Sequence, residues 1–224
     1  RELLTQAIDL NDDGTFEELI FQADIGPRET KTFSVAVGER LMPRREDFKA
    51  YGRFVRERRD DFAWENDRIA HRMYGAALET WAQEPLTSSA VDVWVKRVRS
   101  LVINNWYMLD DYHRDNGEGG DFYSAGRSRG CGGNGLWIAG KLYPSGNFRD
   151  TRVLANGPIR VMFELVYQPW DAGGITVSEV KRITLDAGQN MDRFESRYTL
   201  HGAPRELTHA IGIKKAAGSL SAVS

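Results

Sequence analysis

The last third of the chain restricts the fold most strongly. Four strand-like runs follow one another there, and short polar turns separate them. The runs are Ile159–Tyr167, Ile175–Leu185, Met191–Leu200 and Leu207–Ile213, and the turns are Asp171–Gly174, Asp186–Gln189 and His201–Pro204. Long strand patterns joined by Gly-containing turns are typical of antiparallel sheets. We therefore expect a meander of long strands in this region.

The first third also shows β patterns. The runs Glu18–Gln22 and Lys31–Val37 are separated by the turn dipeptide Gly26-Pro27, which predicts a hairpin or meander. Tyr51–Arg59 alternates like a charged strand and leads into Phe62–Arg68. The run Ile69–Leu78 fits either a strand or a helix, and we interpret it as a strand.

One segment has the spacing of a helix. Apolar residues recur every three or four positions in Val91–Leu109, and Asp92 is placed to favour the N-terminal end. Many strands and one substantial helix predict a mainly β fold, a large antiparallel β-sandwich. A length of 224 residues suits a single domain over residues 1–224.

Glycines are concentrated in one stretch. Residues 117–146 contain ten of the 22 glycines. Such a stretch is not regular secondary structure throughout, so we expect a loop that turns tightly or lies close to another group.

Composition excludes two classes of partner. Acidic and basic residues nearly cancel, 32 against 30, and no long basic tract is present, which argues against nucleic-acid binding. The apolar runs are too short for a membrane helix, which needs about 20 residues. The single Cys131 excludes an internal disulfide.

Because the chain opens on Arg1 rather than Met, we expect a fragment or processed chain with an exposed apolar edge near one terminus.

The glycine-rich stretch holds one group of candidate catalytic residues. His113 and Tyr123 lie there among carboxylates, and an imidazole titrates near neutral pH, so an acid–base site is one interpretation. A polar surface loop is the other. The set His113, Asp115, Glu118 and Asp121 matches neither a calcium nor a zinc spacing, so no metal or other cofactor is predicted, although a metal is not excluded.

Two arginines follow in the same stretch. Arg127 and Arg129 are suited to gripping a carboxylate or sulfate, and the neighbouring glycines allow close approach of backbone N–H groups. The glycines fit neither a phosphate-binding loop nor a dinucleotide fingerprint. Cys131 is more simply interpreted as a small buried residue than as a nucleophile.

A second polar segment lies between Trp64 and Arg72. If it forms one strand, Glu65, Asp67 and His71 share one face, whereas Arg68 and Arg72 share the other. One face would then present acids and a histidine to a substrate. The alternative is an internal network of ion pairs that ties strands together.

Four motifs in order resemble a known family. They are Phe62–Gly75, Tyr112–Tyr123, Ser128–Gly133 and Asn156–Arg160, and they resemble the domain of unknown function DUF4861. The resemblance implies a sandwich similar to the galactose-mutarotase-like supersandwiches. It also implies export, to the periplasm or outside the cell, by bacteria that degrade acidic polysaccharides, in the company of polysaccharide lyases and unsaturated glucuronyl hydrolases. It assigns no catalytic residue.

These observations lead to one functional hypothesis. We expect a carbohydrate-active enzyme that performs β-elimination on a uronic-acid residue of an acidic oligosaccharide, as a lyase or dehydratase. Removal of the proton next to a carboxylate requires a cation for that carboxylate and a nearby base. The alternatives are a sugar epimerase or mutarotase-like enzyme and a non-catalytic glycan-binding module.

The hypothesis assigns roles to named residues. The candidate catalytic residues are His113, His71 and Tyr123. The candidate substrate-binding residues are Arg68, Arg72, Arg127, Arg129, Trp64, Glu65, Asp67 and Glu118. We expect the three motifs that carry them to converge on one concave surface, with at least one arginine near His113 that is not paired with a carboxylate.

Overall fold

The computed structural model describes residues 2–38, 42–83, 86, 89–203, 206–215 and 218. Over the described residues the protein is mainly β, and its strands form four antiparallel sheets beside a single α-helix. This arrangement confirms the expected β-sandwich class. No helix in the described part is long and apolar enough to cross a membrane.

The first large sheet contains three strands of the expected C-terminal meander, whereas the fourth expected run, Leu207–Ile213, forms a strand only at His209–Ile213 and pairs with Cys131–Ile138 in another sheet. The strands of this first sheet pair in the order β10 (Asp150–Asn156), β11 (Arg160–Asp171), β12 (Thr176–Asp186) and β13 (Arg193–His201). The turns between them contain glycines at positive φ, including Gly173 at +66° and Gly188 at +77°, where other residues are strained. Alternation in the sequence therefore predicted the ends of three of these strands, β11, β12 and β13, to within a few residues. β10 was not anticipated.

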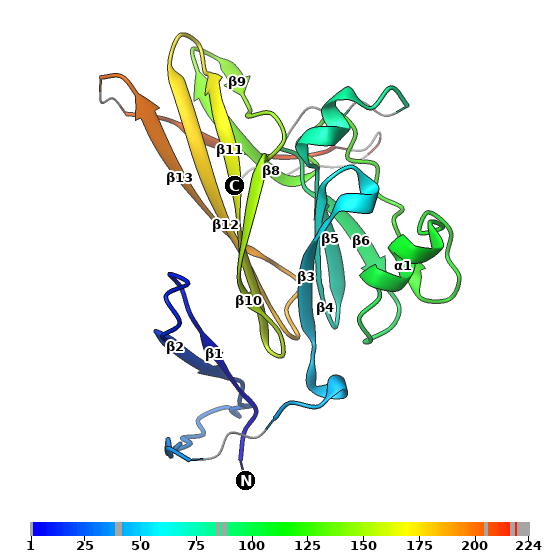
Figure 1. The fold of residues 1–224 in the computed structure, drawn as a ribbon, viewed down its shortest axis with the longest axis vertical. Helices are drawn as coiled ribbons and strands as arrows, with labels where there is room; N and C mark the ends of the chain where they lie inside the picture. Colours follow the sequence, from blue (N-terminus) through cyan, green and yellow to red (C-terminus); the bar gives the residue numbers. More distant parts are fainter. Residues whose placement is uncertain are drawn as a thin grey trace.

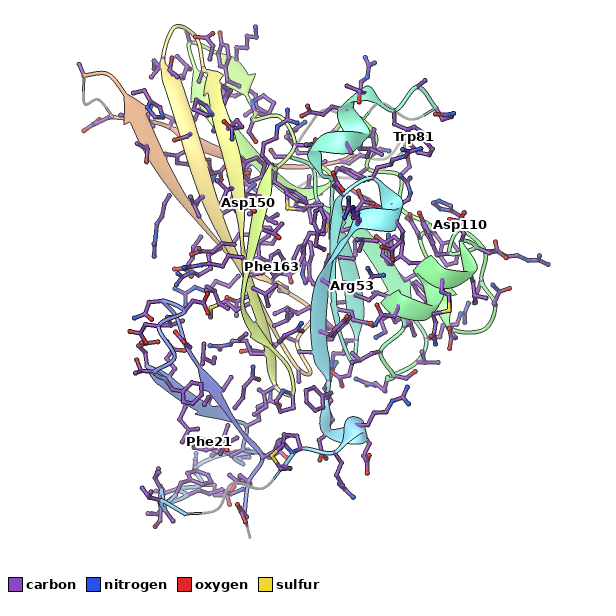
Figure 2. All side chains as sticks on the ribbon, in the orientation of Figure 1. Phe21, Arg53, Trp81, Asp110, Asp150 and Phe163 are labelled. Atoms are coloured by element: carbon purple, nitrogen blue, oxygen red, sulfur yellow. The ribbon has the colours of Figure 1, made fainter. Side chains whose placement is uncertain are left out.

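The second large sheet packs against the first. It consists of β3 (Ala50–Val55), β4 (Asp61–Asn66), β5 (Ile69–Met73), β6 (Asp92–Lys96) and the short β7 (Gly119–Gly120). Figure 1 shows the two sheets side by side, and Figure 2 shows Phe163 in the space between them. The rings of Phe163 and Phe62 stack there at 4.0 Å. We call the face of each sheet that borders this space its inner face.

Smaller elements cover the edges. A three-stranded sheet has the order β14 (His209–Ile213), β8 (Cys131–Ile138) and β9 (Lys141–Tyr143), and a separate hairpin joins β1 (Thr5–Ile8) to β2 (Glu18–Phe21). Short 3-10 turns occupy Arg45–Asp47, Arg56–Arg58 and Ala76–Thr80. The run Ile69–Leu78 is thus a strand only as far as Met73.

The helix is shorter than its spacing predicts. Helix α1 covers Ile103–Leu109, whereas the front of the expected helix is strand β6. Trp94 is buried on the outer face of β6, and that face packs against α1 (Figure 1). The three- and four-residue spacing therefore came from a strand and a helix that contribute to one core, not from one long helix.

The glycine-rich stretch contains a strand where we expected a loop. Three glycines lie within β8, and a Cβ on Gly133 would stand 2.4 Å from the carbonyl oxygen of Arg129. A Cβ on Gly130 would stand 1.9 Å from that of Val91. The glycines allow close contact between backbones, as expected. The expectation of a loop is wrong for β8, because such contact is compatible with a sheet.

The N-terminal hairpin also differs from the prediction. β2 pairs with β1 instead of with Lys31–Val37, which forms no strand. Several large apolar side chains in this region are exposed: Phe16, Leu19, Phe21, Ile25, Phe33, Val35 and Val37. The expected apolar surface near one terminus is therefore confirmed.

Candidate functional site

A tight turn separates the candidate residues of the Trp64–Arg72 segment onto two faces. The side-chain oxygen of Asn66 accepts the N–H groups of Arg68 and Ile69 at 2.8 and 3.0 Å, so the chain reverses between β4 and β5. Glu65 consequently faces outward on β4, whereas His71 faces inward on β5. The prediction that Glu65 and His71 share one face of a single strand is wrong, because the turn places them on two strands with separate alternation of side chains.

The outer face holds a closed network around Arg72. Its guanidinium lies 2.7 Å from Asp92, 3.0 Å from Asp121 and 3.7 Å from Asp61, and all four side chains are buried. The aromatic rings of Tyr74, Trp94 and Tyr112 surround the same cation. Three carboxylates already surround Arg72, so it is not available to an anionic substrate.

His113 lies beside this network. Its Nδ1 is 3.5 Å from Asp121 Oδ2, and its side chain is 68% exposed. His71 lies on the inner face, stacked on Trp64 with ring centroids 5.3 Å apart. The two histidines thus occupy opposite faces of one sheet, and the expectation that their motifs share a surface is wrong. The sequence of a polar segment does not show on which face of a sheet its side chains will lie.

Three further candidates have structural partners. Glu65 Oε2 lies 2.5 Å from Lys96 Nζ, and its Oε1 accepts the N–H groups of Val102 and Ile103 at the start of α1. Burial raises the pKa of Glu65, and Lys96 opposes that rise. Asp67 accepts the N–H of Gly188 at 2.6 Å, and Glu118 accepts the indole N–H of Trp106 at 3.0 Å. These acids hold the sheet, its turns and the helix together.

The remaining arginines and Tyr123 differ in exposure. Arg68 and Arg127 are exposed. Tyr123 is half-buried, and its hydroxyl has no hydrogen-bond partner within the described residues. Burial raises the pKa of Tyr123, so its phenol stays protonated at neutral pH.

The inner face carries a polar group that the sequence did not single out. We call it the inner polar cluster, and its members come from β12, β13, β8, β14 and the segment before β8. They are Glu179, Lys181, Ser196, Tyr198, Asn134, His209 and Arg129. The cluster interrupts an apolar interior, since Leu136 and Val177 lie on one side of it and Phe163 and Ile183 on the other.

Asn134 is the centre of this cluster. Its Nδ2 lies 2.8 Å from Glu179 Oε1, 2.8 Å from the Tyr198 hydroxyl and 3.0 Å from the Ser196 hydroxyl. The Nε2 of His209 lies 3.1 Å from the same nitrogen. An amide nitrogen donates only two hydrogen bonds, so these four groups share its donors, and the Tyr198 hydroxyl also interacts with Ser196 and Glu179.

Lys181 places a charge in the interior. It is 1% exposed, its Nζ lies 3.4 Å from the Tyr167 hydroxyl and 3.7 Å from Glu179 Oε1, and it sits 4.6 Å from the Tyr167 ring centre. An ammonium can donate three hydrogen bonds, and Nζ donates a long one to the Tyr167 hydroxyl. Burial lowers the pKa of Lys181, and the charge of Arg129 lowers it further, whereas Glu179 acts in the opposite sense.

Arg129 is the second cation of the cluster. Its side chain is only partly exposed, its Nη1 is buried without a hydrogen-bond partner, and no carboxylate of the described residues pairs with it. Burial lowers the pKa of Arg129 with no opposing anion. A Cβ on Gly212 would lie 2.5 Å from Arg129 Cγ, so β14 holds the stem of this side chain in place. Arg129 and Lys181 therefore give the cluster two cations against one nearby carboxylate.

A histidine–aspartate pair lies on the same inner face. Asp192 accepts the indole N–H of Trp64 at 2.8 Å, and its other oxygen lies 3.0 Å from Nε2 of His71. Nδ1 and Nε2 of His71 are both buried, and neither makes a hydrogen bond of good geometry in the described part of the chain. A proton on Nε2, the nitrogen 3.0 Å from Asp192, would leave a lone pair on Nδ1, as a general base requires.

Two links connect this pair with the inner polar cluster. The Tyr167 hydroxyl donates to the sulfur of Met73 at 3.9 Å, and Met73 lies two residues after His71 on β5. The same hydroxyl contacts Lys181. Cys131, two residues after Arg129, is exposed, so its interpretation as a buried residue is wrong. Partial desolvation of its thiol is the larger cause of its raised pKa, and the charge of Asp192 adds to it. The sequence candidates His71, Trp64 and Arg129 are thus on the inner face, whereas Arg72, Glu65 and His113 are not.

A signal for the missed residues was present in the sequence. In β12, Val177, Glu179, Lys181, Ile183 and Leu185 stand at alternate positions. Apolar residues at both ends of this series assign it to the inner face, so the two charges in its middle are buried. A charge at a core position of a strand costs free energy unless it has a role or a partner. Asn134, Tyr198, His209 and Asp192 carried no comparable signal.

The loop between β1 and β2 gathers acids that suit a metal. Asp9, Asp13 and Glu17 each offer a carboxylate oxygen within 4.8 Å of the others, and Asn11 and Gly14 complete a D-x-N-x-D-G spacing of the kind seen at the start of calcium loops. Backbone N–H groups of the loop lower the pKa of Asp9 against the opposing effect of burial. This loop lies at the N-terminal hairpin rather than on the inner faces.

Comparison with known proteins identifies the family. The model of the family described as domain of unknown function DUF4861 matches residues 1–223. The chain belongs to this family. It is also 39% identical over 202 residues to a curated relative, "Uncharacterized protein P7" of Formosa agariphila, and the match covers 86% of the chain and 51% of the relative. The chain thus spans about half the length of that DUF4861 relative. No solved structure matches the chain.

Proposed function

We propose that this DUF4861 chain acts on acidic, uronic-acid-containing oligosaccharides by β-elimination, as a lyase or dehydratase, with its site at the inner polar cluster. One observation carries the proposal. Arg129 and Lys181 lie within reach of each other's charge on the inner face, and Arg129 has no carboxylate partner among the described residues. Two desolvated cations with one acid, Glu179, near Lys181 favour an anionic ligand, and a planar carboxylate matches a guanidinium.

The reaction needs three functions, and the inner polar cluster together with the histidine–aspartate pair offers a group for each. Arg129, assisted by Lys181, binds the uronate carboxylate and stabilises the charge that develops when the neighbouring C5 proton leaves. His71, oriented by Asp192, accepts that proton on Nδ1. Burial raises the pKa of Tyr198, which keeps its phenol protonated and makes it the proton donor to the departing oxygen.

The bond changes balance without an added oxidant or reductant. The C5–H bond breaks, its proton moves to the base, and its electron pair is first held as an enolate by the carboxyl group. This pair then forms the C4–C5 double bond as the C4–O bond breaks, and the oxygen leaves with a proton from the acid. Departure of a sugar makes the enzyme a lyase, and departure of water makes it a dehydratase. The same arrangement with reprotonation at C5 from the other side would make it an epimerase.

The test compares two neighbouring arginines. We expect Arg129→Gln to lower the rate of double-bond formation, followed by ultraviolet absorbance, by about 100-fold or more, as loss of a group that stabilises transition-state charge does. Arg127→Gln, two residues away and exposed, should keep the wild-type rate. Equal rates in both variants would contradict the assignment of the carboxylate to Arg129.

Product analysis separates the alternative functions. Binding of acidic oligosaccharides without any product would support a glycan-binding module. A product of changed configuration and no double bond would support an epimerase. Rising ionic strength should weaken binding in the wild type more than in Arg129→Gln, because the variant lacks the charge that salt screens.

A further inference from the structure

A hollow of about 1020 Å³ lies on the outer side of the β3–β7 sheet, away from the inner polar cluster. It is bounded by residues that precede and begin β3, by the segment between β6 and α1, and by the first turn of α1. We call it the β3–α1 groove. Its volume is at the upper end of small-molecule sites, about 300–1,000 Å³, so it has room for a ligand of several rings.

The groove presents aromatic and amide groups together. Phe48 is 38% exposed and Tyr51 is half-buried, so both offer ring surface at the wall. Asn104 and Asn105 are exposed on the first turn of α1. Asn104 accepts the Arg53 Nε–H at 2.6 Å, which fixes its amide, and the side chain of Asn105 has no hydrogen-bond partner among the described residues.

The charges of the groove are close to balance. Arg99 lies 3.3 Å from Asp67, and the buried Glu65 is neutralised by Lys96, while Lys49 is exposed at the entrance. This differs from the inner polar cluster, where cations exceed acids. A nearly neutral groove with ring faces and amides recognises hydroxyl-bearing rings rather than a single strong anion, because amides both donate to and accept from hydroxyls.

We propose that the β3–α1 groove is a second, non-catalytic binding site for a polysaccharide chain. Its ligand class rests on the proposed function, whereas its position and its residues do not. The groove would hold sugar units that are not undergoing reaction, with Phe48 and Tyr51 against ring faces and Asn104, Asn105 and Lys49 against hydroxyl and carboxylate oxygens. It would raise affinity for long chains and leave the affinity for short ones unchanged.

The experiment is gel electrophoresis of the whole chain through separate gels containing polygalacturonate, alginate or hyaluronan, with a gel free of polysaccharide as the reference. We expect retardation in at least one of the three acidic gels. The double variant Phe48→Ala/Tyr51→Ala should weaken that retardation about tenfold, as loss of anchor side chains at an interface does. Phe122→Ala is the matched control, because Phe122 is also exposed, at 53%, but lies outside the groove.

Fold integrity is controlled by a second variant. Tyr51 packs against a core cluster, so its loss can destabilise the sheet, whereas Asn105 and Lys49 are exposed. Asn105→Ala/Lys49→Ala should therefore reduce retardation while its melting temperature stays at the wild-type value. Wild-type retardation in this variant and in the aromatic variant, with both folded, would overturn the proposal, as would the absence of retardation of the wild type in all three gels.

Arg129→Gln separates this proposal from the proposed function. It should lose double-bond formation but keep retardation. If retardation disappears with Arg129→Gln and persists in the groove variants, the polysaccharide binds only at the inner polar cluster and the second site is refuted. If the groove variants lose retardation and no variant or wild type forms a double bond, the groove stands and the elimination reaction fails.

Discussion

The outer face of the β3–β7 sheet and the inner polar cluster bury charge in opposite ways. On the outer face, Arg72 meets Asp61, Asp92 and Asp121 within 3.7 Å, and aromatic rings close the network. On the inner side, Arg129 has a buried Nη1 and no carboxylate partner in the described ranges, and Lys181 has one acid at 3.7 Å. A matched buried charge is part of the framework, whereas an unmatched one indicates a site that a ligand completes.

The largest expected effect concerns the outer face. Arg72→Met should lower the free energy of unfolding by about 3–5 kcal/mol, because removal of one partner leaves buried carboxylates uncompensated. Urea denaturation measures this loss. Arg129→Met should cost far less, since it leaves no buried anion behind. A comparable loss in both variants would show that the two regions do not differ in the proposed way.

The next effect separates the two histidines. His71→Ala should reduce elimination about 100-fold, the lower end of what a general base contributes. His113→Ala should retain the rate, because its exposed ring lies on the other face of the sheet. Because His71 is buried, His71→Gln accompanies His71→Ala as a control for the fold, and its circular-dichroism spectrum should be unchanged. Loss of activity in His113→Ala alone would move the reaction to the outer face.

The smallest effect is a dependence of stability on pH. Folding lowers the pKa of Lys181 below its usual value of 10.5, so in the interval between the two values the unfolded chain binds more protons than the folded one. Stability from this group therefore rises with pH through that interval and is complete above 10.5. Lys181→Met should remove this rise and be neutral or stabilising by about 1 kcal/mol near pH 7. Melting temperatures of the wild type and the variant across this pH interval measure the rise in stability and the effect of the substitution. An unchanged rise in the variant would show that another group causes the rise.

Regular strands were predictable because their signals are local. β11, β12 and β13 follow from alternation and from turns with glycine at positive φ, which the chain specifies within a dozen residues. The helix was misjudged because Trp94 and Trp106 have helical spacing only along the sequence, whereas in the fold they belong to different elements that face each other at 5.7 Å. Lys31–Val37 failed for the converse reason, since a strand pattern needs an adjacent strand to pair with.

The candidate site was predicted in part. Arg129, His71 and Trp64 were named from residue type and context, and the structure places them on the inner faces. Asp192 and Tyr198 were not, because their roles depend on partners 121 and 64 residues away, respectively His71 and Asn134. An aspartate or tyrosine at a turn or on an edge strand has no local property that distinguishes it from a surface residue.

The amino-acid sequence by itself determined the β class, the positions of the long strands, the family resemblance and the candidate arginines. The tertiary structure decided which of those arginines had acids around them. Neither the strand context of Arg72 nor the glycine-rich context of Arg129 predicts its partners, and only strand pairing brings Asp92 and Asp121 to the first and leaves the second beside Lys181. Alternation and turn preference act between neighbours in the chain, but the free energy of a buried charge depends on groups that the fold brings from distant positions.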